Sequence, residues 1–130
     1  MLLCYNISMK QLEFEILRRE DGSSEFDAYI RALPPKDRAK LTAVIEKTEQ
    51  FGIETAIQQQ WVKKLLDGIY ELRSQHGSNI QRALYFHKIG PRYVITHGFT
   101  KKTQRTPARE IDKAKRLRVE YLERQKHDLD

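Results

Sequence analysis

The stretch over residues 69–107 most restricts the folds open to this chain, because three runs of β-forming residues follow one another there. The runs cover residues 69–73, 80–89 and 92–99, and they are rich in Ile, Val, Leu, Tyr and Phe. Turn-forming dipeptides, Gly-Ser and Gly-Pro, separate them. Strands this close in sequence pair through short loops. The stretch therefore predicts a three-strand antiparallel meander.

The predicted pairing brings basic residues together at one end of the sheet. Counting back from the first turn places Arg73 opposite Arg82, and counting back from the second places Arg82 opposite Phe99. Lys101 and Lys102 follow two residues later. Like charges directly opposite each other destabilise a sheet, so this cluster indicates an anionic partner such as phosphate. The alternative interpretation is an ordinary solvated face.

Residues before the meander predict one strand and a helix hairpin. Polar and apolar residues alternate over residues 11–16, which is the period of a half-buried strand. Ser24 is a good N-cap for a helix over residues 25–33. A second helix is expected from Pro35 towards Phe51, because proline is tolerated in a first helical turn. Two helices joined this tightly need a sheet face to cover.

Two further helices are expected on either side of the meander. Residues 53–68 suit a short helix in which Trp61 is a core residue. Thr106 and Pro107 suit the start of a C-terminal helix reaching about residue 125. Its predicted apolar stripe consists of Ala108, Ile111, Ala114, Leu117 and Leu122.

The predicted fold is therefore α+β: a small antiparallel sheet, made of the first strand and the meander, packed against the N-terminal helix hairpin and the C-terminal helix. At 130 residues the chain suits one domain. Residues 1–10 are expected to be disordered or a misassigned start, with Met9 as the alternative first residue. Cys4 stands alone and no apolar run reaches membrane-spanning length, so we expect a cytoplasmic protein without a membrane partner.

Charge is concentrated in the middle of the chain. The net charge is +6, yet residues 60–109 alone hold ten Lys or Arg against two Asp or Glu, a balance of +8. A basic sheet and loop between near-neutral helices is typical of a nucleic-acid-binding surface. An acidic protein partner would explain the same pattern.

The sequence holds no metal-binding, phosphate-loop or nucleophile-elbow motif, so we expect neither a metal nor a cofactor. Arg, Lys and His side chains suit one reaction without them. The 2′-hydroxyl of RNA can attack the neighbouring phosphate, so an enzyme need only align it, move protons and stabilise negative charge. Guanidinium groups are suited to phosphate oxygens, and a lysine or histidine can transfer the proton.

Three motifs carry a family resemblance. They are Tyr70-Glu71-Leu72-Arg73, then Arg82-Ala83-Leu84-Tyr85-Phe86, then His97-Gly98-Phe99 followed by Lys101-Lys102-Thr103 and Thr106-Pro107. With the order strand, helix hairpin, meander and helix, the chain resembles the RelE/ParE toxin superfamily, and within it the HigB-like, phage-derived branch. The resemblance covers residues 11 to about 124.

The resemblance implies a toxin of a type II toxin–antitoxin system. Such a toxin is an mRNA interferase, an endoribonuclease that cuts mRNA in the ribosomal A site and so inhibits translation. Its expected partner is a cognate antitoxin, a small helix-turn-helix protein, and it would meet DNA only within the toxin–antitoxin complex.

The resemblance also implies site residues. Arg82 matches the arginine that contacts the scissile phosphate, and Lys102 the cation that assists the leaving group. Arg73 and Lys101 match neighbouring basic positions of the site, and Arg73 is expected to be catalytic. The catalytic tyrosine of RelE has no counterpart, which leaves His76 or His97 as candidates for proton transfer or as structural residues. The expected RNA-binding residues are Lys88, Arg92, Lys101 and Arg105.

Two other functions fit the same sequence. One is a ParE-like toxin that inhibits DNA gyrase without nuclease activity, and the other is a non-catalytic basic module that binds nucleic acid. The closeness of the cations favours cleavage, because a protein that only binds does not need to pack them together.

Overall fold

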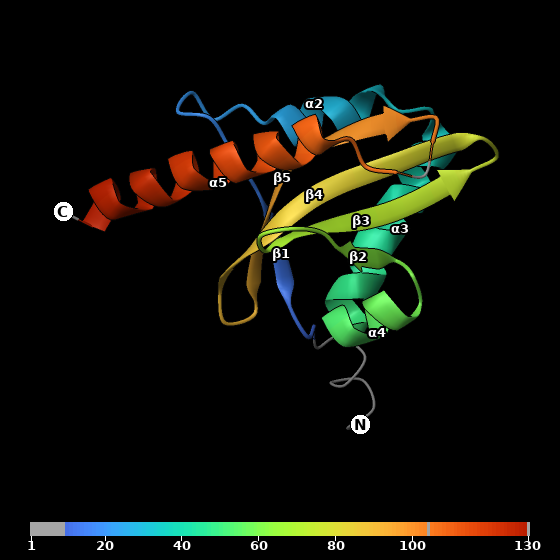
Figure 1. Ribbon diagram of the computed structural model, residues 1–130, viewed down its shortest axis with the longest axis horizontal. Coiled ribbons are helices and arrows are strands. Elements are labelled where there is room, and N and C mark those ends of the chain that lie inside the picture. Colours follow the sequence, from blue (N-terminus) through green and yellow to red (C-terminus); the bar gives the residue numbers. More distant parts are fainter. Residues whose placement is uncertain (1–9, 104, 130) are drawn as a thin grey trace.

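A mixed sheet lies between two helical layers in the computed structural model, which describes residues 10–103 and 105–129 (Figure 1). The strands are β1 (Glu13–Ile16), β2 (Val62–Lys64), β3 (Ile69–His76), β4 (Asn79–Ile89) and β5 (Arg92–Lys101). The helices are α2 (Glu25–Ala32), α3 (Pro35–Phe51), α4 (Ile53–Gln58) and α5 (Ala108–Leu129). The predicted α+β class is confirmed. The expectations for Cys4 and for a start at Met9 lie outside the described residues.

The predicted meander is present with the predicted register. β3, β4 and β5 pair as antiparallel neighbours, Arg73 lies opposite Arg82, and Arg82 lies opposite Phe99. The β4–β5 ladder contains two irregularities, at Leu84/Tyr85 and His87/Ile89. They shift the register in opposite directions and cancel, so the pairing of Arg82 is the one expected from the turns.

The first strand differs from the prediction in its direction. β1 runs parallel to β5, with Ile16 opposite Ile95, so the sheet is mixed and not wholly antiparallel. The strand order is β1-β5-β4-β3-β2. After β1 the chain passes through three helices and enters the sheet again at the far edge. No hairpin links β1 to its neighbour, so no turn fixes its direction.

Residues 53–68 form a shorter helix than expected and an additional strand. α4 ends at Gln58, and β2 then pairs antiparallel with β3. Trp61 lies between them and is only half-buried against the core. Its ring packs against Phe51, with centroids 6.2 Å apart, and carries the Lys47 ammonium 4.6 Å above it.

The starts of α2 and α3 follow the sequence, whereas α5 begins at Ala108, one residue later than predicted, and differs in its buried stripe. The Ser24 side chain accepts a hydrogen bond from the Asp27 N–H and caps α2 as predicted. α5 continues to Leu129, beyond the expected end. Ala114 and Tyr121 are buried, whereas Leu122 is 46% exposed, so the stripe is rotated towards Tyr121.

The two faces of the sheet hold separate cores. Phe26, Leu41 and Val44 of α2 and α3 pack with Tyr85 and Ile95 on one face. On the other face Ala114 and Tyr121 of α5 pack with Ile69, Leu84, Phe86 and Val94. The C-terminal half of α5 extends past the sheet (Figure 1). α5 thus covers only part of its face of the sheet.

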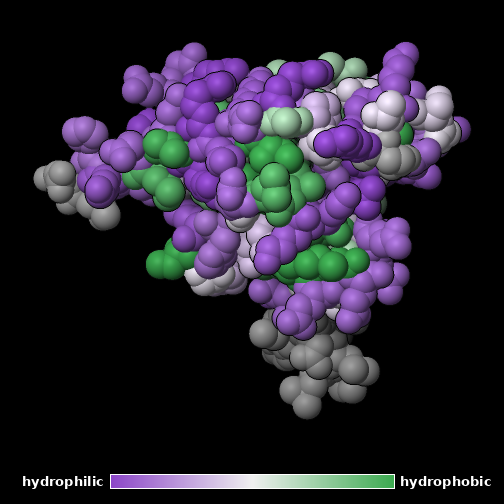
Figure 2. All heavy atoms as spheres, in the orientation of Figure 1, coloured by the Kyte–Doolittle hydropathy of each residue, from purple (hydrophilic) through white to green (hydrophobic). Residues whose placement is uncertain are grey.

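Hydrophobic side chains at the surface are scattered. Figure 2 shows separate hydrophobic areas in this view, surrounded by hydrophilic surface. The large hydrophobic residues left exposed are Phe51, Ile57, Leu66, Ile89, Val119 and Leu122. None of the helices in the described ranges combines the length and hydrophobicity needed to cross a bilayer.

Candidate functional site

Three basic side chains meet on the α5 side of the sheet, near the β3–β4 turn. Arg73 and Arg82 lie opposite each other on β3 and β4, and Lys101 ends β5 opposite Ile80. Side chains alternate between the faces of a strand, so residues two apart share a face. Arg82 therefore lies on the face of Leu84, which packs in the α5 core. The sequence predicted that Lys102 would join these three residues; the gathering is confirmed for Arg73, Arg82 and Lys101.

A buried carboxylate lies at the centre of these cations. Glu71 on β3 is fully buried, and its Oε1 lies 3.3 Å from Nε of Arg82 and 3.5 Å from Nε of Arg73. Its Oε2 accepts a hydrogen bond from the hydroxyl of Thr106. Lys101 Nζ in turn donates to Thr106 Oγ1 at 3.2 Å. We call Glu71, Arg73, Arg82 and Lys101 the Glu71 cluster.

Glu71 was not among the residues predicted for the site. The strand pattern contained a signal, because Glu71 is two residues after buried Ile69 and two before Arg73, and so shares their face. No sequence pattern indicated the contact between Glu71 and Thr106. Thr106 was expected to cap the C-terminal helix, and its hydroxyl instead binds a residue 35 positions away.

Arg82 forms the floor of the cluster. Its side chain is 2% exposed, and its Nη1 donates to the carbonyl oxygens of Gln81 at 2.9 Å and Ser74 at 3.4 Å. Burial lowers the pKa of Arg82. The negative charge of Glu71 raises this pKa, and the positive charge of Arg73 lowers it further. These contacts fix the guanidinium in place.

A hollow of about 260 Å³ opens at this end of the sheet. It reaches Arg82, and the side chain of Arg73 beside it is 22% exposed. Gln60, Ser74 and Gln75 complete its lining. Arg73 and Arg82 both line the hollow, and Arg73 has the more exposed side chain of the two.

Lys101 and Lys102 differ sharply although they are adjacent. Lys101 is 8% exposed, whereas Lys102 is exposed. Burial lowers the pKa of Lys101 to about 8. Glu71 raises this pKa, and the positive charges of Arg82, Arg73 and Lys63 lower it. Of the two lysines, Lys101 is the one that belongs to the cluster.

The two candidate histidines serve other contacts. His76 Nδ1 lies 3.1 Å from Oδ1 of Asp37, and Oδ2 of Asp37 accepts from the side-chain amide of Asn79, so this histidine helps to tie the β3–β4 turn to α3. His97 is 1% exposed beneath α5, with Nε2 2.9 Å from Glu110 Oε1 and Nδ1 3.0 Å from Thr96 Oγ1. Neither histidine makes a contact with the Glu71 cluster among the described residues.

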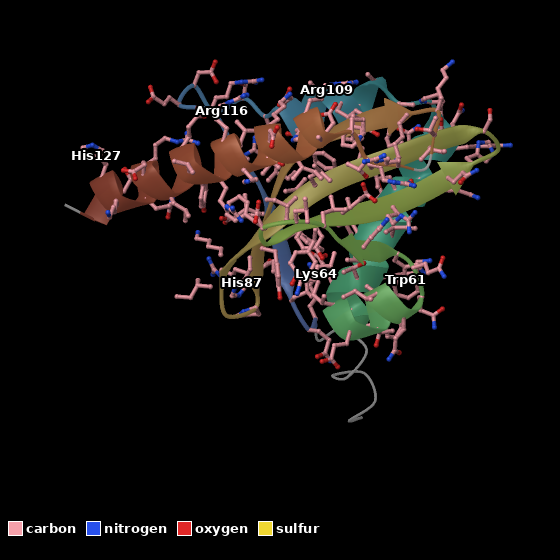
Figure 3. All side chains as sticks on the ribbon, in the orientation of Figure 1. Trp61, Lys64, His87, Arg109, Arg116 and His127 are labelled. Atoms are coloured by element: carbon pink, nitrogen blue, oxygen red, sulfur yellow. The ribbon has the colours of Figure 1, made fainter. Side chains whose placement is uncertain are left out.

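The other predicted RNA-binding residues lie at different places on the sheet. Lys88 and Arg92 flank the β4–β5 turn, at the opposite end from Arg82. Figure 3 shows their neighbour His87 at that turn, while Arg109 lies at the start of α5. Lys88 binds Glu15, with 3.0 Å between Nζ and Oε1. Arg105 is exposed in the segment before α5. Only Lys101 of this group lies in the cluster.

The described residues contain no group of three His, Cys, Asp or Glu side chains placed to hold a metal ion. The polar groups that the structure brings together at this site are two guanidinium groups, an ammonium, a carboxylate and a hydroxyl.

The comparisons with known proteins give one family. A family model described as "Phage derived protein Gp49-like (DUF891)" matches residues 28–119, a span that includes every residue of the Glu71 cluster. No curated protein matches the chain. The match covers well over half of the 130 residues. The chain therefore belongs to the Gp49-like family of phage-derived proteins, which is a family of RelE-like toxins.

Proposed function

We propose that this protein is the toxin of a type II toxin–antitoxin system and that it cuts mRNA in the ribosomal A site, within the cytoplasm, without a metal ion. We assign it to the HigB-like branch. Family membership implies an antitoxin partner, which we propose is a small helix-turn-helix protein. The observation that carries the proposal is the Glu71 cluster, with its three cations around one carboxylate beside an open hollow.

The charge balance of the cluster favours a phosphate ligand. The cluster holds three positive groups and one negative group: both guanidinium groups lie within 3.5 Å of Glu71, and Lys101 is linked to Glu71 through Thr106, so positive charge remains in excess. Holding like charges together is unfavourable, and a bound phosphate would relieve it. A guanidinium offers two parallel donors to phosphate oxygens, which suits Arg73 at the mouth of the hollow.

The proposed reaction needs little more than alignment and charge. When the 2′-oxygen attacks the adjacent phosphorus, negative charge increases on the phosphate oxygens. The Arg82 guanidinium is already held by Gln81, Ser74 and Glu71, so it would not have to reorganise as that charge develops. We propose that Arg73 and Arg82 stabilise the transition state.

The remaining basic residues are proposed as contacts to RNA outside the scissile phosphate. Lys102 and Arg105 follow β5 and are exposed near the cluster. Lys88 and Arg92 lie at the far end of the sheet, where they would reach a more distant part of the mRNA or ribosomal RNA. Such contacts would position the substrate and carry no part of the bond breaking.

The proposal is tested by inducing the protein in bacteria and mapping mRNA 5′ ends shortly afterwards. Wild type should create new ends inside translated codons. Arg73→Ala and Arg82→Lys should reduce this cleavage by about 100-fold, because each removes a guanidinium donor. Lysine is chosen at position 82 because alanine would leave buried Glu71 without its nearest cation. Arg116→Ala is the matched control, because Arg116 is an exposed arginine on α5 (Figure 3). This variant should cleave mRNA like wild type.

Three results would contradict the proposal. Growth arrest with intact mRNA would indicate a gyrase-inhibiting toxin. Absence of arrest would indicate a basic binding module. Full activity in both arginine variants would show that the cluster is not the active site.

A further inference from the structure

We propose that Lys101, and not Lys102 or a histidine, gives the proton to the departing 5′-oxygen, and that Glu71 and Thr106 position Lys101 for this step. This inference rests on the proposed nuclease function. It deepens that function by naming the group that moves a proton.

Lys101 is held in place by hydrogen bonds. Its Nζ donates to Thr106 Oγ1 at 3.2 Å, and the Thr106 hydroxyl donates to Glu71 Oε2. The same carboxylate contacts Arg73 and Arg82 through its other oxygen. Lys101 is therefore linked through two hydrogen bonds to the groups proposed to hold the phosphate. Lys102 makes no hydrogen bond or ion pair among the described residues.

Charged groups from three strands surround Lys101. The charged groups around Lys101 are Glu71 and Arg73 on β3, Arg82 on β4 and Lys63 on β2, which lies opposite Glu71. Burial and the three cations bring the pKa of Lys101 to about 8. At neutral pH the amine still carries its proton, but it releases that proton far more readily than a lysine with the usual value of about 10.4.

The two histidines, which are the other candidates for proton transfer, are bound to other partners. His76 is bound to Asp37 at the turn, and both ring nitrogens of His97 have partners beneath α5. The same arrangement explains the position of the Thr106 hydroxyl between Lys101 and Glu71. Its hydroxyl accepts from Lys101 and donates to Glu71, so it orders the ammonium and carboxylate without placing them in direct contact.

The proposed step is balanced as follows. The bond between the 2′-oxygen and phosphorus forms, and the bond between phosphorus and the 5′-oxygen breaks. The electron pair of the broken bond goes to the 5′-oxygen, which takes a proton from Lys101 Nζ. The proton of the 2′-hydroxyl passes to water, and the neutral lysine regains a proton from solvent.

The test measures ribosome-dependent cleavage by purified toxin under single-turnover conditions from about pH 6 to about pH 9.5. The wild-type rate should fall above about pH 8, as Lys101 loses its proton. Lys101→Arg keeps the positive charge but cannot release a proton in this range, so its rate at pH 7 should be about 100-fold lower and the descending limb should disappear. Lys102→Ala should weaken mRNA binding and keep the wild-type pH profile.

An mRNA with sulfur in place of the scissile 5′-oxygen separates proton donation from a structural role. A thiolate leaves without needing a proton, so Lys101→Arg should cut this substrate at the wild-type rate, whereas Arg73→Ala should stay impaired. Thr106→Val should lower the rate on the oxygen substrate, and Thr106→Ser should restore it because the hydroxyl returns.

The outcomes distinguish the inference from the function on which it rests. A wild-type protein that cuts no mRNA on ribosomes would overturn both. Cleavage by wild type with an unimpaired Lys101→Arg, or with a Lys101→Arg that the sulfur substrate does not rescue, would overturn the role of Lys101 alone. Thr106→Val with a wild-type rate would overturn the positioning role of Thr106. Thermal unfolding of each variant shows whether it is folded.

Discussion

Gly98 is predicted to be required because α2 leaves no room for a side chain there. Gly98 lies on β5 opposite Ala83, beneath the ring of Tyr29. A Cβ atom at this position would lie inside 3.0 Å of Cδ2 and Cε2 of Tyr29 and 3.1 Å from its Cγ. The ring cannot shift freely, because the Tyr29 hydroxyl donates to Gln81 and lies 3.1 Å from the carbonyl oxygen of Phe99.

The expected cost of Gly98→Ala follows from these contacts. Forcing an extra methyl into a packed site costs about 1–3 kcal/mol. Displacing Tyr29 also weakens its hydrogen bond to Gln81, which contributes about 1 kcal/mol. The free energy of unfolding should therefore fall by about 2–4 kcal/mol, which lowers the melting temperature by roughly 10 °C in a domain of this size.

The assay is urea unfolding followed by circular dichroism for Gly98→Ala, Tyr29→Ala and the double variant. Removing the ring removes the clash, so the double variant should lose less stability than the sum of the two single losses, by at least about 1 kcal/mol. Losses that add within about 0.5 kcal/mol would refute the reasoning, because independent sites behave in that way. A Gly98→Ala as stable as wild type would refute it as well.

Three further predictions concern buried charged groups. Burial lowers the pKa of His97 below its usual 6.5, although Glu110 partly opposes this, so protonation of His97 favours the unfolded chain. The free energy of unfolding should therefore fall as the pH drops below 6.5. Urea titrations should show a smaller fall for His97→Gln than for wild type. Asp37→Asn should cost about 1–3 kcal/mol because it disturbs the buried anchor of the β3–β4 turn, and an unchanged melting temperature would contradict that anchor. Glu71→Leu and Arg82→Met should each lower the free energy of unfolding by about 3–5 kcal/mol, whereas the double variant should have a free energy of unfolding within about 1 kcal/mol of wild type. Equal losses in all three variants would contradict a mutual pairing of the two charges.

The sequence predicted the meander well because two short turns determine both pairings. Arg73 and Arg82 could be placed opposite each other by counting from Gly77, and the later irregularities of β4 cancel before they reach Arg82. The direction of β1 was beyond this reasoning. Its partner β5 is more than 70 residues away, and only the packing of the helices between them decides how the two strands run.

The site was predicted only in part, for a physical reason. Counting charges identified the cations but treated Glu71 as a small correction to a basic surface. Distinguishing Lys101 from Lys102 required knowledge of where β5 ends, because the strand continues to Lys101 and does not stop at Phe99 as expected. Lys101 is therefore the last strand residue on the face of the cluster, and Lys102 lies beyond the strand. The link through Thr106 depends on where the chain returns after β5, which no local pattern records.

The energetics of the Glu71 cluster indicate that the buried charges add little to the stability of the fold. Removing a carboxylate and a guanidinium from water costs several kcal/mol for each ion, and their attraction repays this only with good geometry. Here Oε1 of Glu71 and Nε of Arg82 lie 3.3 Å apart without forming a well-aligned hydrogen bond. Apolar side chains of similar volume would hold the sheet at least as well. We therefore attribute this arrangement to the proposed function, in which an ordered set of positive charges beside the hollow receives a phosphate.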